Sequence, residues 1–178
     1  MSIYEELCAA ARARMIRDKK FEVEANIFPE RLRRALSNYL EIPERQLELK
    51  GRPTGGGEEP PVWDWPELTK LDTNDQDADG FFIFALLIWL DLSQRTESMV
   101  VLGAWSFFGP RFKFRPVPDG FDVALLDFRG RDNPHFEIRN DDLKPLLVRL
   151  IEDCRQALSF DPFEGASRPR SIGFDTSW

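Results

Sequence analysis

Histidine and cysteine are scarce in this sequence. Its 178 residues include one histidine, His135, and two cysteines, Cys8 and Cys154. A single histidine nearly excludes cysteine–histidine metal sites, and two cysteines near opposite ends are too few for a disulfide framework. We therefore expect reduced thiols in a cytoplasmic protein. No complete catalytic set or cofactor-binding loop is evident, so we expect no catalytic residue, metal or cofactor.

A long apolar segment is also lacking. The longest apolar run, residues 81–90, has ten residues, whereas a membrane-spanning helix needs about 20. Residues 2–20 carry several charges among their apolar positions, which is atypical of a signal peptide. We expect no membrane partner.

Acidic charge is concentrated in one part of the chain. Between Glu58 and Asp79 there are eight acidic residues and one basic residue, Lys70. This segment carries -7, which equals the net charge of the whole chain, so the remainder sums to zero. An acidic surface attracts basic partners and repels nucleic acid. We expect another protein, of basic character, as the partner, and no direct contact with nucleic acid.

Apolar residues recur at helical spacing at both ends of the sequence. A capping box at Ser2 precedes such a pattern over residues 2–20. A second helical pattern starts at Pro29, a residue that suits the first position of a helix. A last helix is predicted after Asn140 or Asp141, either of which can cap it. The sequence therefore predicts two N-terminal helices and one C-terminal helix.

The middle of the chain has the pattern of β-strands. Within residues 111–115, phenylalanines alternate with basic residues, which predicts one buried and one solvated face. The fold class we expect is α+β: an antiparallel meander of about five strands with the helices packed on one face. The predicted strands are residues 81–92, 99–108, 111–115, 121–128 and 135–139, with a further short segment at 46–50.

These elements predict one α+β domain over residues 1–160. Residues 51–80 are an acidic, glycine- and proline-rich loop insertion within it. Residues 161–178 are a C-terminal tail. The sequence does not predict the oligomeric state.

The acidic segment ends in the pattern Asp75-x-Asp77-x-Asp79-Gly80. This spacing matches the first three ligand positions of an EF-hand calcium loop, in which position 12 supplies a bidentate glutamate. Position 12 here is Leu86. Two interpretations stay open: a calcium-stabilised binding domain, and a solvated acidic turn before a buried strand.

A second motif lies within residues 121–139. Asp122 and Glu137 fall on neighbouring predicted strands, and Arg139 follows two residues later. This pattern resembles the hairpin of the PD-(D/E)xK nuclease superfamily, in which two carboxylates bind a divalent metal and a lysine helps to position or activate water. The resemblance implies metal binding by Asp122 and Glu137, but arginine stands at the lysine position and cannot act as a base. A metal-dependent nuclease is the alternative function, and an exposed hairpin face is the alternative structure.

Two tryptophans lie inside the acidic segment, in the sequence PPVWDWP. In a proline-stiffened loop they either cover the sheet or contact a partner, where tryptophan is enriched among the residues that dominate binding. The function we expect is non-enzymatic protein binding, by an inhibitor, an immunity-type protein or an adaptor. The predicted binding residues are Glu58, Glu59, Trp63, Asp64 and Trp65.

Overall fold

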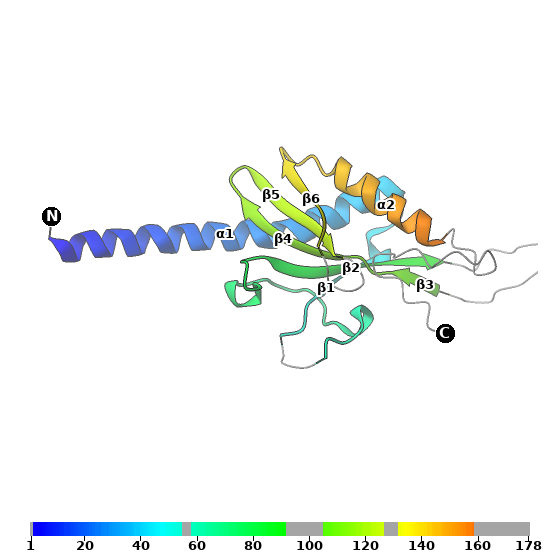
Figure 1. Cartoon of the computed structure of the whole chain (residues 1–178), viewed down its shortest axis with the longest axis horizontal. Coiled ribbons are helices and arrows are strands. Elements are labelled where there is room, and N and C mark those ends of the chain that lie inside the picture. The colour runs from blue at the N-terminus through cyan, green and yellow to red at the C-terminus, as the bar shows by residue number, and fades with distance from the viewer. Residues whose placement is uncertain (1, 55–57, 92–104, 127–131, 159–178) are drawn as a thin grey trace, which may run out of the picture.

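The computed structural model describes residues 2–54, 58–91, 105–126 and 132–158. This part of the chain forms two α-helices and one antiparallel sheet (Figure 1). The α+β class is therefore confirmed. The helices are α1 (Ile3–Leu40) and α2 (Lys144–Leu158); the strands are β1 (Leu47–Gly51), β2 (Phe82–Asp91), β3 (Trp105–Phe108), β4 (Arg111–Val117), β5 (Gly120–Leu126) and β6 (Asp132–Arg139).

The sheet is a meander in the order β1-β2-β4-β5-β6, and β3 pairs with β2 in line with β4. The register of β2 is the same against both strands, since Ile88 opposes Phe108 and Ala85 opposes Arg111. Between the two strands the Leu86 amide donates to the Pro110 carbonyl over 3.1 Å. Pro110 has no N–H to return this bond, which accounts for the interruption. The predicted meander of about five strands is thus confirmed.

The two predicted N-terminal helices are one continuous helix of 38 residues, so the predicted break before Pro29 is wrong. A proline inside a helix removes one hydrogen bond and costs about 3 kcal/mol. Here Pro29 is buried together with Phe28 and Leu32, and burying a large apolar side chain contributes about 1.5–3 kcal/mol. Packing on the sheet therefore offsets the proline.

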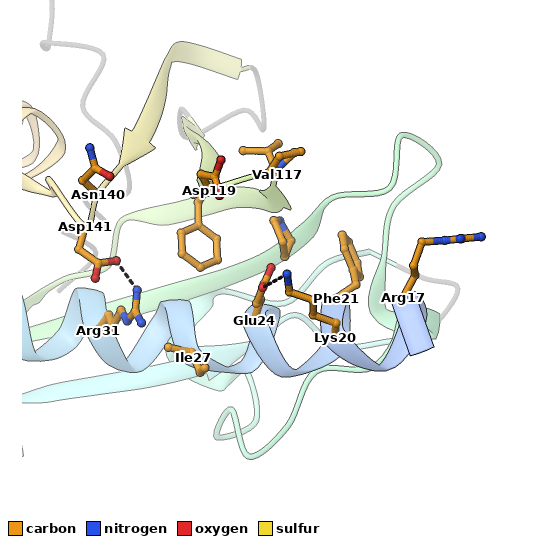
Figure 2. Close-up of a pocket in the computed structure, with 14 residues that line it drawn as sticks. Arg17, Lys20, Phe21, Glu24, Ile27, Arg31, Val117, Asp119, Asn140 and Asp141 are labelled. Atoms are coloured by element: carbon orange, nitrogen blue, oxygen red, sulfur yellow. Dashed lines mark hydrogen bonds and ion pairs between the residues drawn. The ribbon is translucent and has the colours of Figure 1, made fainter. Parts of the chain in front are cut away.

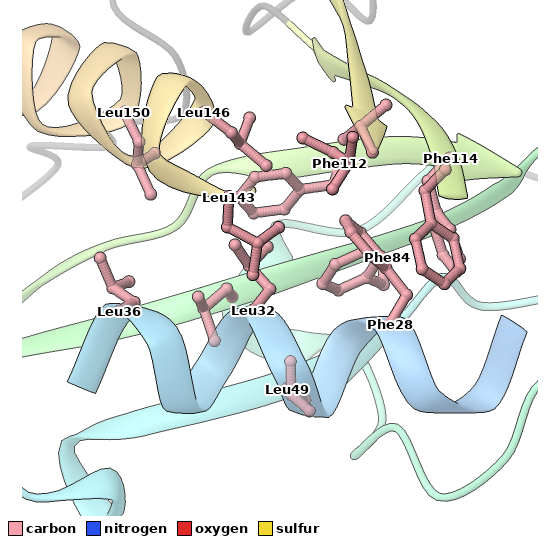
Figure 3. Close-up of a cluster of buried hydrophobic side chains, with 14 of the residues drawn as sticks. Phe28, Leu32, Leu36, Leu49, Phe84, Phe112, Phe114, Leu143, Leu146 and Leu150 are labelled. Carbon is pink, nitrogen blue, oxygen red and sulfur yellow. The ribbon is translucent and has the colours of Figure 1, made fainter. Parts of the chain in front are cut away.

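One face of the sheet carries the hydrophobic core. Phe84 and Phe112 stack with ring centroids 5.1 Å apart, and Phe28 of α1 packs on Phe114 at 4.7 Å. Leu146 of α2 belongs to the same buried cluster (Figure 3). Both helices thus cover one face, as the sequence predicts.

The start of α2 differs from the prediction. Asn140 and Asp141 adopt left-handed backbone conformations, with φ of 49° and 59°. The side chain that accepts the Lys144 amide, over 3.2 Å, is that of Asp142. The capping residue therefore lies one or two positions after the predicted ones, because the turn after β6 occupies Asn140 and Asp141.

Some predictions fall outside the described residues. They are the beginning of the predicted strand at 99–108, the end of the predicted strand at 121–128, and the tail at 161–178. Among the helices that the structure describes, none is both long enough and apolar enough to cross a bilayer.

Candidate protein-binding surface

Residues 58–67 form a turn that a buried tryptophan fixes to the domain. Trp65 is only 2% exposed, and its Nε1–H donates to the Pro60 carbonyl over 3.0 Å. The intervening chain makes the 3-10 turn η2 (Val62–Asp64), which the Trp65 amide closes by donating to the Val62 carbonyl over 3.1 Å. Trp65 is thus buried and structural, whereas Trp63 stays partly exposed.

The end of this turn runs along the edge strand β1. The Gly51 amide donates to the Pro66 carbonyl over 2.9 Å, and the Leu68 amide donates to the Leu49 carbonyl over 3.0 Å. Lys50 and Glu67 form an isolated antiparallel bridge between these bonds. The turn is therefore closed by the bond from Trp65 to Pro60 and held at its C-terminal end by backbone pairing with β1.

Four of the carboxylates on this segment divide into two groups. Glu58, Asp64 and Glu67 are exposed and form no ion pair within the described part of the chain. Glu59 instead contacts cations of its own chain, at 3.4 Å from Arg52 and 3.9 Å from Arg111. Three acidic side chains are thus presented to solvent by a fixed turn.

The second half of the acidic segment pairs with Lys113, the middle residue of the basic face of β4. Lys113 is 9% exposed, and its Nζ lies 3.3 Å from Asp77 and 3.6 Å from Asp79. The same nitrogen lies 4.7 Å from the centroid of the Phe81 ring, a cation–π contact. The face predicted to be solvated is therefore covered at Lys113, because the charges of the acidic segment compensate a buried lysine.

Asp77 is held in its charged form. Partial burial acts to raise its pKa, but hydrogen bonds from the Phe81 amide and from Lys113, the charge of Lys113 and the Asp79 amide lower it. The net result is a pKa below the ordinary value for aspartate. The carboxylate thus organises its turn as an anion, through bonds of 2.9 Å and 3.0 Å from the amides of Phe81 and Asp79.

The candidate calcium ligands have other contacts. Asp75 accepts the Asp72 amide over 2.8 Å in a reciprocal cap of the turn η3 (Thr73–Asp75), and Asp77 and Asp79 pair with Lys113. The segment then enters the strand β2, whereas an EF-hand loop would lead into a helix. The described residues contain no group of three or more potential metal-ligating side chains.

The fold brings together Asp122 and Glu137, the two carboxylates of the predicted nuclease motif. Asp122 and Glu137 are directly opposed in the β5–β6 pairing, so their side chains share a face of the sheet. Asp122 lies 3.2 Å from Arg115 and 3.0 Å from His135, while Glu137 lies 3.4 Å from Arg139. Each carboxylate is therefore already compensated by a basic side chain of the same protein.

A groove of about 550 Å³ lies between α1 and the turns that follow β4 and β6 (Figure 2). Its wall on α1 includes Phe21 and the ion pair of Lys20 with Glu24, at 3.6 Å. Across the groove Arg31 pairs with Asp141 (Figure 2). The charges in this groove are mostly satisfied by one another, which makes it a weaker candidate than the acidic turn.

Sequence reasoning missed one feature, the exposure of the first turns of α1. Ile3, Leu7 and Met15 have the helical spacing of a buried face, yet they are 78%, 65% and 71% exposed. Figure 1 shows this end of α1 projecting beyond the sheet. The sequence did contain a signal of this exposure. Arg14, Arg17 and Asp18 lie on the side of α1 that faces the core farther along the helix, and charged side chains at these positions indicate that this part is not buried.

No protein-family model, curated protein or solved structure matches this chain. Its function is therefore proposed from its own residues and their arrangement.

Proposed function

We propose that this protein acts by binding another protein, as an inhibitor, an immunity-type protein or an adaptor does, and that its contact surface is the acidic turn at residues 58–67. The single observation that carries this proposal is the presentation of Glu58, Asp64 and Glu67. The three carboxylates are exposed and without ion pairs in the described chain, on a turn fixed by the buried Trp65.

The anchoring of the turn favours binding. A loop that is already ordered loses less conformational entropy on association than a flexible one. Trp65 and the backbone bonds to β1 supply this order, since Trp65 closes the turn onto Pro60 and the bonds to β1 hold its C-terminal end. The partly exposed Trp63 adds aromatic surface next to Asp64, and such surface contributes strongly to protein interfaces.

The charge of the turn defines the class of partner. Glu59, Asp77 and Asp79 of the acidic segment pair with basic side chains of the same chain, whereas Glu58, Asp64 and Glu67 form no such pair within the described residues and together present three negative charges on one turn. A basic surface would be attracted to it, and such steering raises the association rate and weakens with salt. The expected partner is therefore a protein with a basic patch.

The nuclease alternative is supported only by the opposition of Asp122 and Glu137. Arg115 pairs with Asp122 and Arg139 with Glu137, and the His135 ring nitrogen lies 3.0 Å from Asp122. We prefer protein binding because the three exposed carboxylates of the acidic turn form no ion pair within the described residues, whereas Asp122 and Glu137 do.

Neutralising the three exposed carboxylates with isosteric amides tests the proposal. A variant with Glu58→Gln, Asp64→Asn and Glu67→Gln changes the formal charge from -7 to -4 without altering Trp65. Immobilised wild-type protein should retain a basic protein from a lysate of its own cells at low salt. The triple variant should retain at least about tenfold less, which corresponds to about 1.4 kcal/mol.

A matched control carries the same change of charge elsewhere. Glu41, Asp119 and Glu152 are exposed and lie away from the acidic turn in sequence, so Glu41→Gln, Asp119→Asn and Glu152→Gln should leave retention unchanged. Equal loss in both variants would mean that overall charge, and not this turn, is responsible. Unchanged retention in the first variant would refute the proposed surface.

A further inference from the structure

The main chain of the acidic segment meets α1 at Leu71, where the side chain of Asn26 binds it. The Leu71 amide donates to Asn26 Oδ1 over 2.8 Å, and Asn26 Nδ2 donates to the Leu71 carbonyl, also over 2.8 Å. One side chain thus bonds to both polar groups of one main-chain residue, as a residue of a neighbouring antiparallel strand would. This pair of bonds is here called the Asn26 clamp.

The orientation of the Asn26 side chain is fixed by its own helix. Its Nδ2 also donates to the Glu22 carbonyl over 2.8 Å, four residues earlier in α1. The two hydrogens of the amide group therefore bind two carbonyl oxygens, while the amide oxygen accepts an N–H. Because Asn26 is partly buried beside the core residue Ala25, α1 presents it to the acidic segment in one orientation.

The Asn26 clamp holds a stretch of chain that lacks other main-chain hydrogen bonds. Over residues 69–71, the bonds to Asn26 are the only main-chain hydrogen bonds made within the described residues. Before this stretch Leu68 is bonded to β1, and after it Asp72 caps the turn η3. Asn26 therefore fixes the point at which the acidic segment crosses from β1 to α1.

Asparagine suits this position because its neutral amide carries a donor and an acceptor side by side. The Leu71 side chain is 3% exposed and belongs to the core cluster, so its main-chain groups lie where an unpaired N–H or C=O costs free energy. A carboxylate at position 26 would have no donor and would face carbonyl oxygens instead. A serine is too short to make both bonds.

We propose that Asn26 is a positioning residue for the acidic turn, so that a change confined to α1 weakens binding at residues 58–67. Glu67 is the last exposed carboxylate of this turn and lies four residues before Leu71. Without the Asn26 clamp, only the bonds of the two neighbours of Glu67 to β1 hold this end of the turn. The inference rests on the proposed function, because it concerns the same surface.

Positioning and simple electrostatics predict opposite results for Asn26→Asp. The change takes the formal charge from -7 to -8, which by itself would strengthen the attraction of a basic partner. It also removes the donor to the Leu71 carbonyl, which breaks the clamp. The positioning role therefore predicts weaker binding by the more acidic protein.

Two further variants complete the set. Asn26→Ser removes the clamp without changing the charge. Asn38→Asp is the matched control, because it adds the same charge to the same helix at an exposed position. Within the described residues Asn38 makes no side-chain hydrogen bond to the acidic segment, so this variant should keep the clamp.

Hydrogen exchange of the full chain, followed by NMR, tests the clamp itself. The Leu71 amide should exchange about tenfold faster in Asn26→Asp and Asn26→Ser than in the wild type, since a hydrogen bond of ordinary strength has about this effect. Asn38→Asp should leave this rate unchanged. Circular dichroism should show the same secondary structure in all four proteins. An unchanged Leu71 rate in both Asn26 variants would overturn the clamp.

The pH dependence of Asn26→Asp separates the clamp from a loss of packing. A protonated carboxyl group carries a hydroxyl donor beside its carbonyl acceptor, so it can replace the amide in both bonds to Leu71. The excess of the Leu71 exchange rate over the wild-type rate should therefore shrink from neutral pH to about pH 4. Asn26→Ser has nothing to protonate at this position, so it should keep its excess. The same pH profile in both variants would contradict the assigned bonds.

Binding of a capped hexalysine peptide, measured by fluorescence anisotropy at low salt, tests the positioning role. Asn26→Asp and Asn26→Ser should each bind about threefold more weakly than the wild type, which is the effect expected when one exposed carboxylate is displaced. Asn38→Asp should bind at least as tightly as the wild type. Equal affinity of the wild type and both Asn26 variants, with the clamp broken, would overturn the positioning role alone.

A different outcome would count against the acidic turn. If the wild type does not bind hexalysine, or if the variant with Glu58→Gln, Asp64→Asn and Glu67→Gln binds it equally well, the proposed surface is wrong. The positioning role would then fall with it, whereas the exchange rates of Leu71 would still report whether Asn26 holds the chain.

Discussion

At the scale of single residues, the pairing of Lys113 with Asp77 explains why an acidic segment lies against this sheet. A lysine on a strand is seldom buried unless its charge is compensated, and Asp77 lies 3.3 Å away. The alternation of residues 111–115 predicted correctly which way Lys113 points. The sequence did not reveal that Asp77 pairs with Lys113, because the two residues are 36 positions apart.

Replacing Asp77 with asparagine should lower stability in a pH-dependent way. The folded pKa of Asp77 lies below its ordinary value of 3.8, so its stabilising contribution is present above that value and is lost as pH falls through the folded pKa. Asp77→Asn should reduce the free energy of unfolding by about 1–2 kcal/mol at neutral pH. Urea denaturation at several pH values should show this difference shrinking below about pH 4.

Asp79→Asn is the control for this measurement. The Asp79 side chain is 75% exposed and lies farther from Lys113, at 3.6 Å, so its loss should cost clearly less. An equal effect of the two changes, or a difference for Asp77→Asn that persists at acidic pH, would contradict the assigned role of Asp77.

The positions of the Trp63 and Trp65 side chains could not be predicted from the sequence. The sequence allowed both rings either to cover the sheet or to contact a partner, and only the structure separates them. Trp65 is buried, and replacing a buried tryptophan with alanine costs about 3–5 kcal/mol. A double replacement of both tryptophans would therefore confound binding with stability, which is why the carboxylates are the better targets.

At the scale of elements, the strands were predicted more accurately than the helices. The nearly continuous apolar run at 81–92 predicted a central strand, and β2 begins and ends within one residue of it. Helix α1 was divided in two because Pro29 suits a helix start, while residues 21–28 contain no glycine or further proline to end a helix. Whether a helix passes through a proline depends on tertiary packing, which local sequence does not encode.

The continuity of α1 can be tested at Val23, which lies between the two helices that the sequence predicts. Val23 is 49% exposed, so its replacement changes little packing. In a helix interior, Val23→Gly should be less stable than Val23→Ala by about 1 kcal/mol. Urea denaturation of the two variants checks this. Equal stability would indicate that residues 21–28 are not helical.

At the scale of the whole molecule, the acidic segment has two parts with different roles. Its second part, with Asp77 and Asp79, compensates the buried Lys113. Its first part presents the carboxylates of the acidic turn to solvent. Net charge and its position in the sequence predicted an acidic surface, but the division into paired and unpaired carboxylates required the fold.

Site-specific photo-cross-linking tests the central claim most directly. A photoreactive amino acid in place of Asp64, at the exposed acidic turn, should cross-link to a discrete basic protein in the cells that make this chain. The same amino acid in place of Glu152, exposed on α2, should give no such product. A product at both positions, or at Glu152 alone, would contradict the assignment of the acidic turn as the binding surface.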